Sequence, residues 1–199
     1  MEKQLLREFK LFEANDVEIV ESDSGLLKMT GVIQKANTPN ANNRIYPMAL
    51  LKREDNNMQD SIKDRRALGE LDHPDSPIVQ LENTSHILSK TWWDDDSLLG
   101  EIEVLDTPKG KILASLIEAG VKLGISSRGL GSTTKTNEGY DMVEDDFNMI
   151  CYDMVSNPST SNAFMHLKEN NEFMTLVSNN RNFHLEKILD EMLDLDLDF

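Results

Sequence analysis

The sequence predicts an α+β domain built around a mainly antiparallel β-sheet or β-barrel. Five short apolar segments, each bounded by Gly, Asp, Asn or Pro, have the length and residue content of β-strands. Only two segments in the body of the chain have helical spacing, and they do not alternate regularly with the strands. These observations favour a sheet or barrel accompanied by a few separate helices.

Two helices and five strands are expected in detail. The first helix should begin at Pro47, because proline fits the first turn of a helix, and should run towards Arg65. The second should extend from Lys109 to Ala119 and end before Gly120, since glycine is common just after a helix. The expected strands cover residues 26–34, 87–93, 98–105, 121–127 and 147–155.

Composition narrows the classes of function. The 199 residues suffice for one domain, and 39% apolar and 28% charged residues are typical of a soluble globular protein. No apolar run is long enough to span a membrane, and the N-terminus does not resemble a secretory signal, so we expect a cytoplasmic location. A net charge of -16 argues against a nucleic-acid partner. The oligomeric state stays open, and a homo-oligomer is one alternative.

The C-terminal residues 183–199 have an acidic, amphipathic pattern. Leucine, isoleucine and methionine recur there at helical spacing between aspartates and glutamates. The pattern predicts a helix, which either packs on the body of the protein with a solvated face or serves as a docking or removable peptide.

His73 is the first candidate for chemistry. The following Pro74 favours an extended backbone at His73. Glu70 and His73 have the spacing of a metal-binding pair on a helix, but Gly69 and Pro74 disfavour that helix, so we expect no metal and no other cofactor. His73 is then either a structural imidazole or a general base.

Ser126 is the second candidate. It lies at the end of an apolar strand, after Gly124 and shortly before Gly129 and Gly131. Glycines there let the main chain turn and direct N–H groups at a developing oxyanion, which suits a serine nucleophile. The alternative is a plain glycine-rich turn. An α/β-hydrolase elbow would need glycine in place of Arg128, so that fold is disfavoured.

A resemblance to a known family joins these candidates. The chain resembles the prohead core proteases of T-even-type tailed phages over roughly residues 28 to 165. The motifs that carry the resemblance are Asn43 to Pro47, Gly69 to Pro74, Trp92 with Trp93, Gly124 to Ser132, and Thr136 to Tyr140. In that family the corresponding histidine and first serine are the catalytic pair, and they fall on His73 and Ser126. A relationship to herpesvirus assembly proteases implies a β-barrel surrounded by helices.

The resemblance also suggests a third catalytic residue. Related capsid proteases place it on a strand that follows the serine, and Asp153 occupies the comparable position. A carboxylate among apolar residues needs a partner, and His73 would serve. A salt bridge from Asp153 to Arg128 or Arg44 is the alternative.

The residues around Ser126 have further expected roles. Main-chain N–H groups from Arg128 through Gly129 to Gly131 would bind the oxyanion. Arg128 could assist them or bind an acidic substrate side chain, and a surface ion pair is the alternative. Ser127 is expected on the other face of the strand, as a neighbour of the site and not as the nucleophile.

Two features depart from the family pattern. Asp72 stands where the family has Asn, and we expect its side chain to be solvated. The chain after Ala163 finds no clear match. We therefore expect a protease domain over residues 1–165 and an acidic helical tail over residues 166–199.

The resemblance implies a serine endopeptidase of head maturation. Its substrates would be scaffold and core proteins and the major capsid protein, cleaved after glutamate inside the prohead in the host cytoplasm. Glu169 and Glu191 fit the implied Leu/Ile-x-Glu pattern, so the tail is a candidate for self-cleavage. The alternatives are a non-enzymatic core or scaffold component and an acyl hydrolase of small esters.

Overall fold

The computed structural model describes residues 3–8, 27–156 and 164–165. All of them belong to one compact unit, Met1–Lys168. The predicted C-terminal helix and the candidate cleavage sites at Glu169 and Glu191 lie outside the described residues. Within the described ranges, no helix combines the length and the apolar character that crossing a membrane requires.

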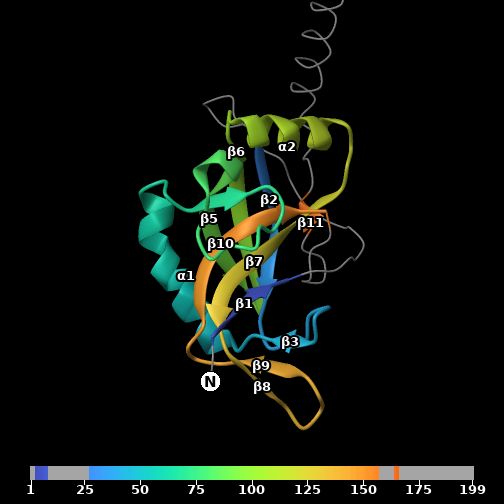
Figure 1. Ribbon diagram of the computed structural model, residues 1–199. Helices are drawn as coiled ribbons and strands as arrows, with labels where there is room; N and C mark the ends of the chain where they lie inside the picture. Colours follow the sequence, from blue (N-terminus) through green and yellow to red (C-terminus); the bar gives the residue numbers. More distant parts are fainter. Residues whose placement is uncertain (1–2, 9–26, 157–163, 166–199) are drawn as a thin grey trace, which may run out of the picture. The chain divides into compact units, whose positions relative to one another are not determined.

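The described strands form three sheets (Figure 1). The first has the order β1-β7-β10, with β11 also paired to β7; the second has the order β2-β6-β5-β4; the third has the order β3-β9-β8. The strands are β1 (Gln4–Arg7), β2 (Lys28–Lys35), β3 (Arg44–Ile45), β4 (Leu68–Glu70), β5 (Thr84–Asp94), β6 (Ser97–Val104), β7 (Leu123–Gly131), β8 (Thr133–Lys135), β9 (Asp141–Val143), β10 (Asn148–Val155) and β11 (Phe164–Met165).

The predicted fold class is confirmed in part. Apart from the short parallel pair β3 and β9, the paired strands of the described residues are antiparallel, as a mainly antiparallel α+β protein requires. The herpesvirus-protease-like barrel is not seen, because the described strands divide into separate sheets and do not close on one another.

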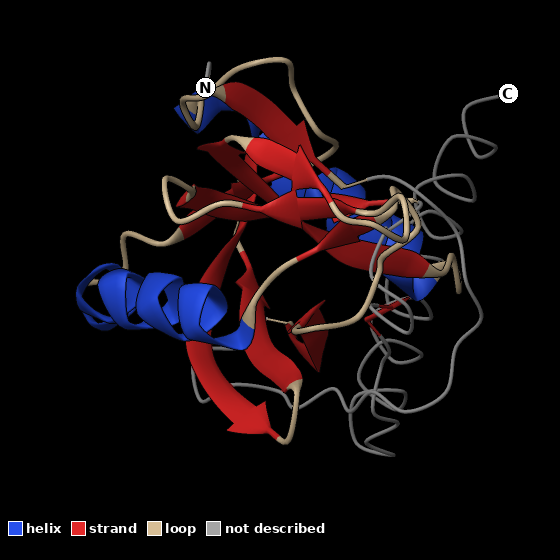
Figure 2. Cartoon of the chain, turned by 90° about the horizontal axis from the view of Figure 1, so that it is seen from below, coloured by secondary structure: helices blue, strands red, loops and turns tan. Residues whose placement is uncertain are grey.

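Two helices lie at the outside of the strands, α1 (Met48–Lys63) and α2 (Pro108–Glu118) (Figure 2). Both were expected from the sequence within one or two residues. The side chain of Thr107 accepts a hydrogen bond from the N–H of Gly110 and so satisfies a main-chain donor at the start of α2. Gly120 follows the helix with φ 76°, a left-handed conformation that glycine adopts without steric cost.

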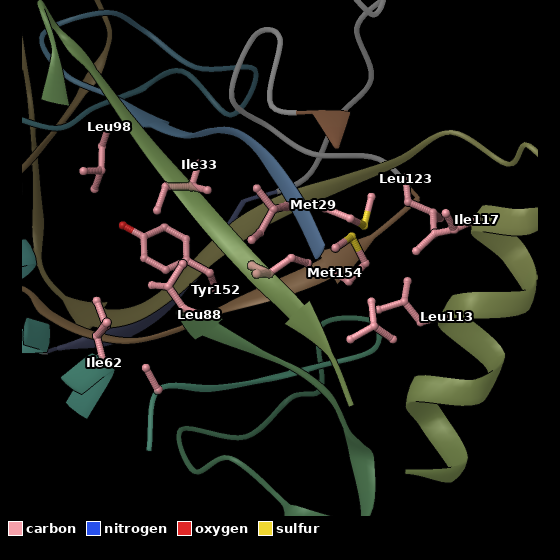
Figure 3. Packing of buried hydrophobic residues seen from close by; sticks show 14 residues of the cluster. Met29, Ile33, Ile62, Leu88, Leu98, Leu113, Ile117, Leu123, Tyr152 and Met154 are labelled. Atoms are coloured by element: carbon pink, nitrogen blue, oxygen red, sulfur yellow. The ribbon is translucent and has the colours of Figure 1, made fainter. Parts of the chain in front are cut away.

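The main hydrophobic core joins the two larger sheets and both helices (Figure 3). Leu113 and Ile117 of α2 point towards Leu123 of β7 and Met154 of β10. Alternation along β7 places Leu123 and Ile125 in this core. The opposite face of β7 therefore carries Ser126 and Arg128.

A second contact between the sheets lies at the end of β4. Leu71, directly after β4, forms an isolated parallel bridge with Met154 of β10. The N–H of Asp72 donates to the carbonyl oxygen of Met154 at 2.8 Å. The loop that follows β4 is therefore fixed to β10, a strand of the other sheet.

Glycine at position 69 is required by this close approach. A Cβ atom there would lie 2.2 Å from the carbonyl oxygen of Tyr152 and 2.2 Å from Nε2 of His86. We expect Gly69→Ala to lower the free energy of unfolding by about 1–3 kcal/mol, since a main-chain oxygen cannot move as freely as a side-chain end. Urea unfolding followed by circular dichroism measures the change.

Gly100→Ala is the matched comparison for this prediction. The three heavy atoms nearest to a Cβ atom at Gly100 would be side-chain methyl groups of Ile33 and Leu88, at 2.9 to 3.0 Å. Those groups can rotate, so the loss should be smaller than for Gly69→Ala. Equal losses in both variants would contradict the importance of the β4–β10 contact.

Candidate active site

His73 and Asp153 meet where the two larger sheets join. Nδ1 of His73 lies 2.7 Å from Oδ2 of Asp153, and both side chains are fully buried. Burial alone would raise the pKa of Asp153, but the hydrogen bond with His73 and the charge of Arg128 outweigh it and hold that pKa below its usual value. Asp153 is therefore a carboxylate hydrogen-bonded to the imidazole ring.

The turn before His73 explains how the ring reaches β10. Asp72 has φ 67°, in the left-handed region that Asp and Asn tolerate better than most residues. Its side chain is exposed, as predicted, although the backbone there is left-handed and not extended. The turn conformation also gives a physical reason for either Asp or Asn at this position.

Ser126 lies directly opposite Asp153 in the antiparallel pair of β7 and β10. Directly opposed residues project to the same face with Cβ atoms roughly 5 Å apart. A register shift between Met149 and Cys151 sets this alignment, because it moves the end of β10 by one residue relative to β7. The cross-strand register thus places Ser126 beside the carboxylate that holds His73.

The hydroxyl of Ser126 has a second neighbour from the N-terminus. It donates a hydrogen bond of 2.7 Å to the main-chain oxygen of Glu8. Glu8 directly follows β1, in which Arg7 pairs with Arg128 of β7. The N-terminal strand therefore lies along the strand that carries Ser126, and its last described carbonyl group contacts the serine.

The side chain of Glu8 is completely buried and bound by four side chains. Nδ2 of Asn40 and Nδ2 of Asn42 each donate to Oε2 at 2.7 Å, Nη1 of Arg44 donates to Oε1 at 3.2 Å, and the hydroxyl of Tyr46 donates to Oε1. Burial and the charge of Glu8 raise the pKa of Tyr46 well above its usual value, so the phenol keeps its proton. These residues form a carboxylate pocket.

Leu6 occupies an apolar site two residues before Glu8. Its side chain is 1% exposed and belongs to a buried cluster that includes Tyr46, Leu50 and Phe147. Arg7, between the two, points outwards and pairs with the exposed Asp75 at 3.5 Å. The side chain of Leu6 thus fills an apolar site, that of Arg7 points outwards, and that of Glu8 fills the carboxylate pocket.

The neighbours of Ser126 lie in different surroundings. Ser127 is on the core side of β7, where its hydroxyl is 3.4 Å from Oε1 of the buried Gln34. Arg128 is fully buried and donates to Glu70, to the carbonyl oxygen of Ser76 and to Asp153. The surface ion pair considered for Arg128 is therefore wrong.

The oxyanion role expected of Arg128 to Gly131 stays a prediction. These residues are paired with β1 on one side and, except for Gly131, with β10 on the other. Gly129 is needed for packing, because a Cβ atom there would lie 2.4 Å from the ring of Phe147. The guanidinium of Arg128 is already bonded inside the protein, so we assign it to the support of Asp153.

The metal hypothesis gains no support from Glu70. Its carboxylate bonds Arg128 and the N–H of Gln80. In the part of the chain that the structure describes, no three side chains of His, Cys, Asp or Glu gather as metal ligands would.

Comparisons with known proteins identify the family. The model of the family described as prohead core protein serine protease matches residues 5–175. The chain belongs to this family. It is 34% identical over 169 residues to the prohead core protein protease of Enterobacteria phage T4, which covers 83% of this chain and 79% of the relative. The solved structure of the bacteriophage T4 capsid assembly protease, gp21, matches with a TM-score of 0.72 and 31% identity over 79% of this chain and 100% of that chain.

Family membership makes this chain a prohead protease with a role in phage head maturation. Sequence reasoning on this prohead protease missed Glu8, Asn40 and Asn42. A signal was present for Glu8 alone. Leu6 and Glu8 have the same Leu-x-Glu spacing that was noted near the C-terminus. Glu70 was considered only as a metal ligand.

A buried histidine next to the site should make the stability of this prohead protease depend on pH. Burial lowers the pKa of His86 to about 4, and the ring bonds Ser85 and the carbonyl oxygen of Tyr152. Between pH 6.5 and 4 the unfolded chain binds a proton that the folded chain does not, so stability falls as the pH falls. We expect a loss of about 3 kcal/mol across this window.

The comparison with His86→Gln isolates this contribution. Chemical unfolding of both proteins at several pH values gives their free energies of unfolding. The variant should be less stable at pH 7, but its stability should fall less between pH 6.5 and 4. Parallel curves for the two proteins would contradict the assignment.

Proposed function

We propose that this prohead protease is a serine endopeptidase in which Ser126 is the nucleophile, His73 the general base and Asp153 the residue that orients the base. We further propose that it cleaves after glutamate and that Glu8 is one of its own cleavage sites. One observation carries the proposal: the hydroxyl of Ser126 contacts the carbonyl oxygen of a residue whose carboxylate fills a dedicated pocket.

The proposed mechanism uses two acyl transfers. Oγ of Ser126 attacks the carbonyl carbon of the glutamate residue, and its proton passes to Nε2 of His73, because Nδ1 is bonded to Asp153. The tetrahedral intermediate collapses, the C–N bond breaks, and His73 returns the proton to the leaving amine. Water then attacks the ester and gives a proton to His73. The bond between the acyl carbon and Oγ breaks, His73 returns the proton to Oγ of Ser126, and the carboxylic product leaves.

Strand addition to β7 supports a peptide substrate. Gln4 to Arg7 pair antiparallel with Gly131 to Arg128, so the residues before the carbonyl group are held by main-chain pairing. Peptide recognition by strand addition gains affinity from the main chain and specificity from alternate side chains. The side chains that enter pockets are Leu6 and Glu8, which agrees with the Leu/Ile-x-Glu pattern implied by the resemblance.

The Glu8 pocket supports the choice of glutamate. A buried carboxylate needs compensation by donors and charge, and here Arg44 provides the charge while Asn40, Asn42 and Tyr46 provide neutral donors. A substrate with an apolar residue at this position would leave these buried donors unpaired.

Self-processing follows from the position of Glu8 in the same chain. Hydrolysis of the bond after Glu8 would release residues 1–8 and leave Phe9 as the new N-terminus. Removal of the tail after Glu169 or Glu191 stays a separate proposal, because both lie outside the described residues.

The proposed substrates in trans are the scaffold and core proteins and the major capsid protein of the prohead, inside the host cell. A non-enzymatic scaffold component remains the alternative function, and a small-ester hydrolase would use the same residues. A scaffold would be expected to consist mostly of long helices, whereas the described residues form eleven strands and two α-helices of 16 and 11 residues. Proteolysis that is lost when the Ser126 hydroxyl group is removed separates a protease from both alternatives.

Ser126→Ala should abolish self-cleavage. The full-length chain, purified and incubated, should lose residues 1–8 and give a mass and N-terminal sequence that begin at Phe9. In Ser126→Ala the rate should fall at least about a thousandfold, because the variant lacks the hydroxyl group that contacts the Glu8 carbonyl group.

Ser127→Ala is the matched control for the nucleophile, because its hydroxyl faces Gln34 on the other side of β7. It should retain self-cleavage within about tenfold of the wild-type rate, since it loses only one long hydrogen bond in the core. Equal loss in both serine variants, or no cleavage in the wild type, would overturn the proposal.

Glu8→Gln should slow self-cleavage strongly, by about a hundredfold, because the amide cannot pair with the charge of Arg44 and brings its own donors to a pocket of donors. In an Arg44→Gln background the same substitution should cost less than about tenfold, since the charge that distinguishes Glu from Gln is gone. The four self-cleavage rates, measured by mass spectrometry, form a double-mutant cycle. Independent effects of the two substitutions would contradict recognition of Glu8 by Arg44.

A further inference from the structure

Glu70 is a buried carboxylate that the proposed mechanism does not use. We propose that Glu70 is a positioning residue that acts through Arg128: it offsets the charge of Arg128, so that Asp153 retains its full electrostatic effect on the imidazolium of His73. This inference rests on the proposed function, because it concerns the base in that mechanism.

Two further buried ionic side chains, Arg128 and Glu70, lie beside the bond between His73 and Asp153. Arg128 contacts the Asp153 carboxylate through Nε at 2.9 Å and Nη2 at 3.2 Å. The same Nη2 group donates to Oε2 of Glu70. The side chains of Glu70, Arg128 and Asp153 are all 0% exposed, so water contributes little screening.

The main chain of Glu70 also contacts Asp153 directly. Its own main-chain N–H donates to Oδ1 of Asp153 at 3.1 Å. One residue thus binds Asp153 through its backbone and binds the arginine partner of Asp153 through its side chain. Asp153 is held from both directions while Oδ2 faces His73.

The pair of Glu70 and Arg128 also holds the loop that carries His73. Oε1 of Glu70 accepts the N–H of Gln80 at 3.0 Å, and Nη1 of Arg128 donates to the carbonyl oxygen of Ser76 at 2.8 Å. Both contacts lie on the chain that follows His73. The network therefore fixes the loop as well as the carboxylate.

The charges of the network give Glu70 its specific role. If Arg128 and Asp153 were alone, their charges would cancel, and an imidazolium at His73 would be a buried, uncompensated cation. Glu70 adds a second carboxylate, so the network has one net negative charge before proton transfer. When His73 takes the proton of Ser126, the buried cluster becomes neutral, and the transition state that forms the imidazolium is stabilised.

The other groups near His73 do not change this count. The thiol of Cys151 contacts Arg128 and Asp153, but burial raises its pKa well above the usual value and the thiol stays protonated. Glu8 and Arg44 form their own ion pair. His86 on β5 also interacts with Asp153, but burial lowers its pKa to about 4 and it is neutral near pH 7. Among the described residues, the charged groups that contact the His73 ring or its carboxylate are therefore Asp153, Arg128 and Glu70.

The test measures the pH dependence of self-cleavage in the full-length chain. Glu70→Gln removes one negative charge but keeps the size of the side chain. We expect the plateau rate to fall about ten- to a hundredfold and the acid limb of the pH profile to move about one pH unit lower, because the protonated ring is less stabilised. Nitrogen NMR of the labelled imidazole should show the same shift of the protonation midpoint in Ser126→Ala protein, without reference to activity.

Three variants separate charge from structure. Glu70→Asp keeps the charge and should keep the acid limb at the wild-type pH even if the rate falls. Glu103→Gln removes a buried carboxylate of β6 that is paired with Arg65 and Lys28. This variant should leave the acid limb of the pH profile unmoved. The double variant Glu70→Gln/Arg128→Gln keeps one net negative charge and should also leave it near the wild-type pH, which keeps the proposal testable if Glu70→Gln alone does not fold.

The outcomes distinguish the two proposals. The proposed function is overturned if the wild-type chain does not cleave itself, or if the Ser126→Ala variant cleaves itself as fast as the wild type. A wild-type chain that depends on Ser126, with an acid limb and an imidazole midpoint unchanged in Glu70→Gln, overturns the role of Glu70 alone. A shift in the double variant as large as in Glu70→Gln would also overturn it.

Discussion

The buried carboxylate of Asp153 is the constraint on which the rest of the site depends. A buried carboxylate must be paired with donors and compensating charge, and Asp153 finds them on β4, on β7 and on the loop that follows β4. The hydrogen bonds and ion pairs of Asp153 therefore join the two larger sheets at one place, and the hydrophobic core joins them at another. The same contacts bring His73 to the strand pair that carries Ser126, so that one electrostatic requirement serves both stability and the geometry of the site.

The N-terminal strand shows how the chain can occupy its own site. Two kinds of contact hold it: main-chain pairing of β1 with β7, and the pocket that binds the carboxylate of Glu8. Because both partners belong to one chain, their effective concentration is high and does not depend on dilution. Under the proposed function, the first bond to be cleaved would be one in the same molecule, and its release would open the edge of β7 to other chains. Processing and substrate recognition would then share a single set of pockets.

Much of the fold could be predicted because the long elements have strong local patterns. The strands that became β2, β5, β6, β7 and β10 have eight to eleven residues, and the residues before α1 and α2 include Pro47 and Thr107, which are typical of helix starts. The missed strands, β1, β3, β4, β8, β9 and β11, have two to four residues. So short a segment shows no reliable period, and its extended form is decided by the strand beside it. For this reason the sequence did not predict β1 or its pairing with β7.

The sequence by itself determined the kinds of residue present, the order of the main strands and helices, and, through the motifs around His73 and Ser126, the family. Only the tertiary structure decided which of these residues meet. The sequence offered Arg128 as an alternative partner of Asp153, but local patterns could not show that Asp153 binds both His73 and Arg128, or that Arg128 also binds Glu70. Nor could they pair Glu8 with Ser126, because that contact joins residues 118 positions apart. Such pairings depend on strand register and on the partners that a buried charge can reach, and both are properties of the folded chain.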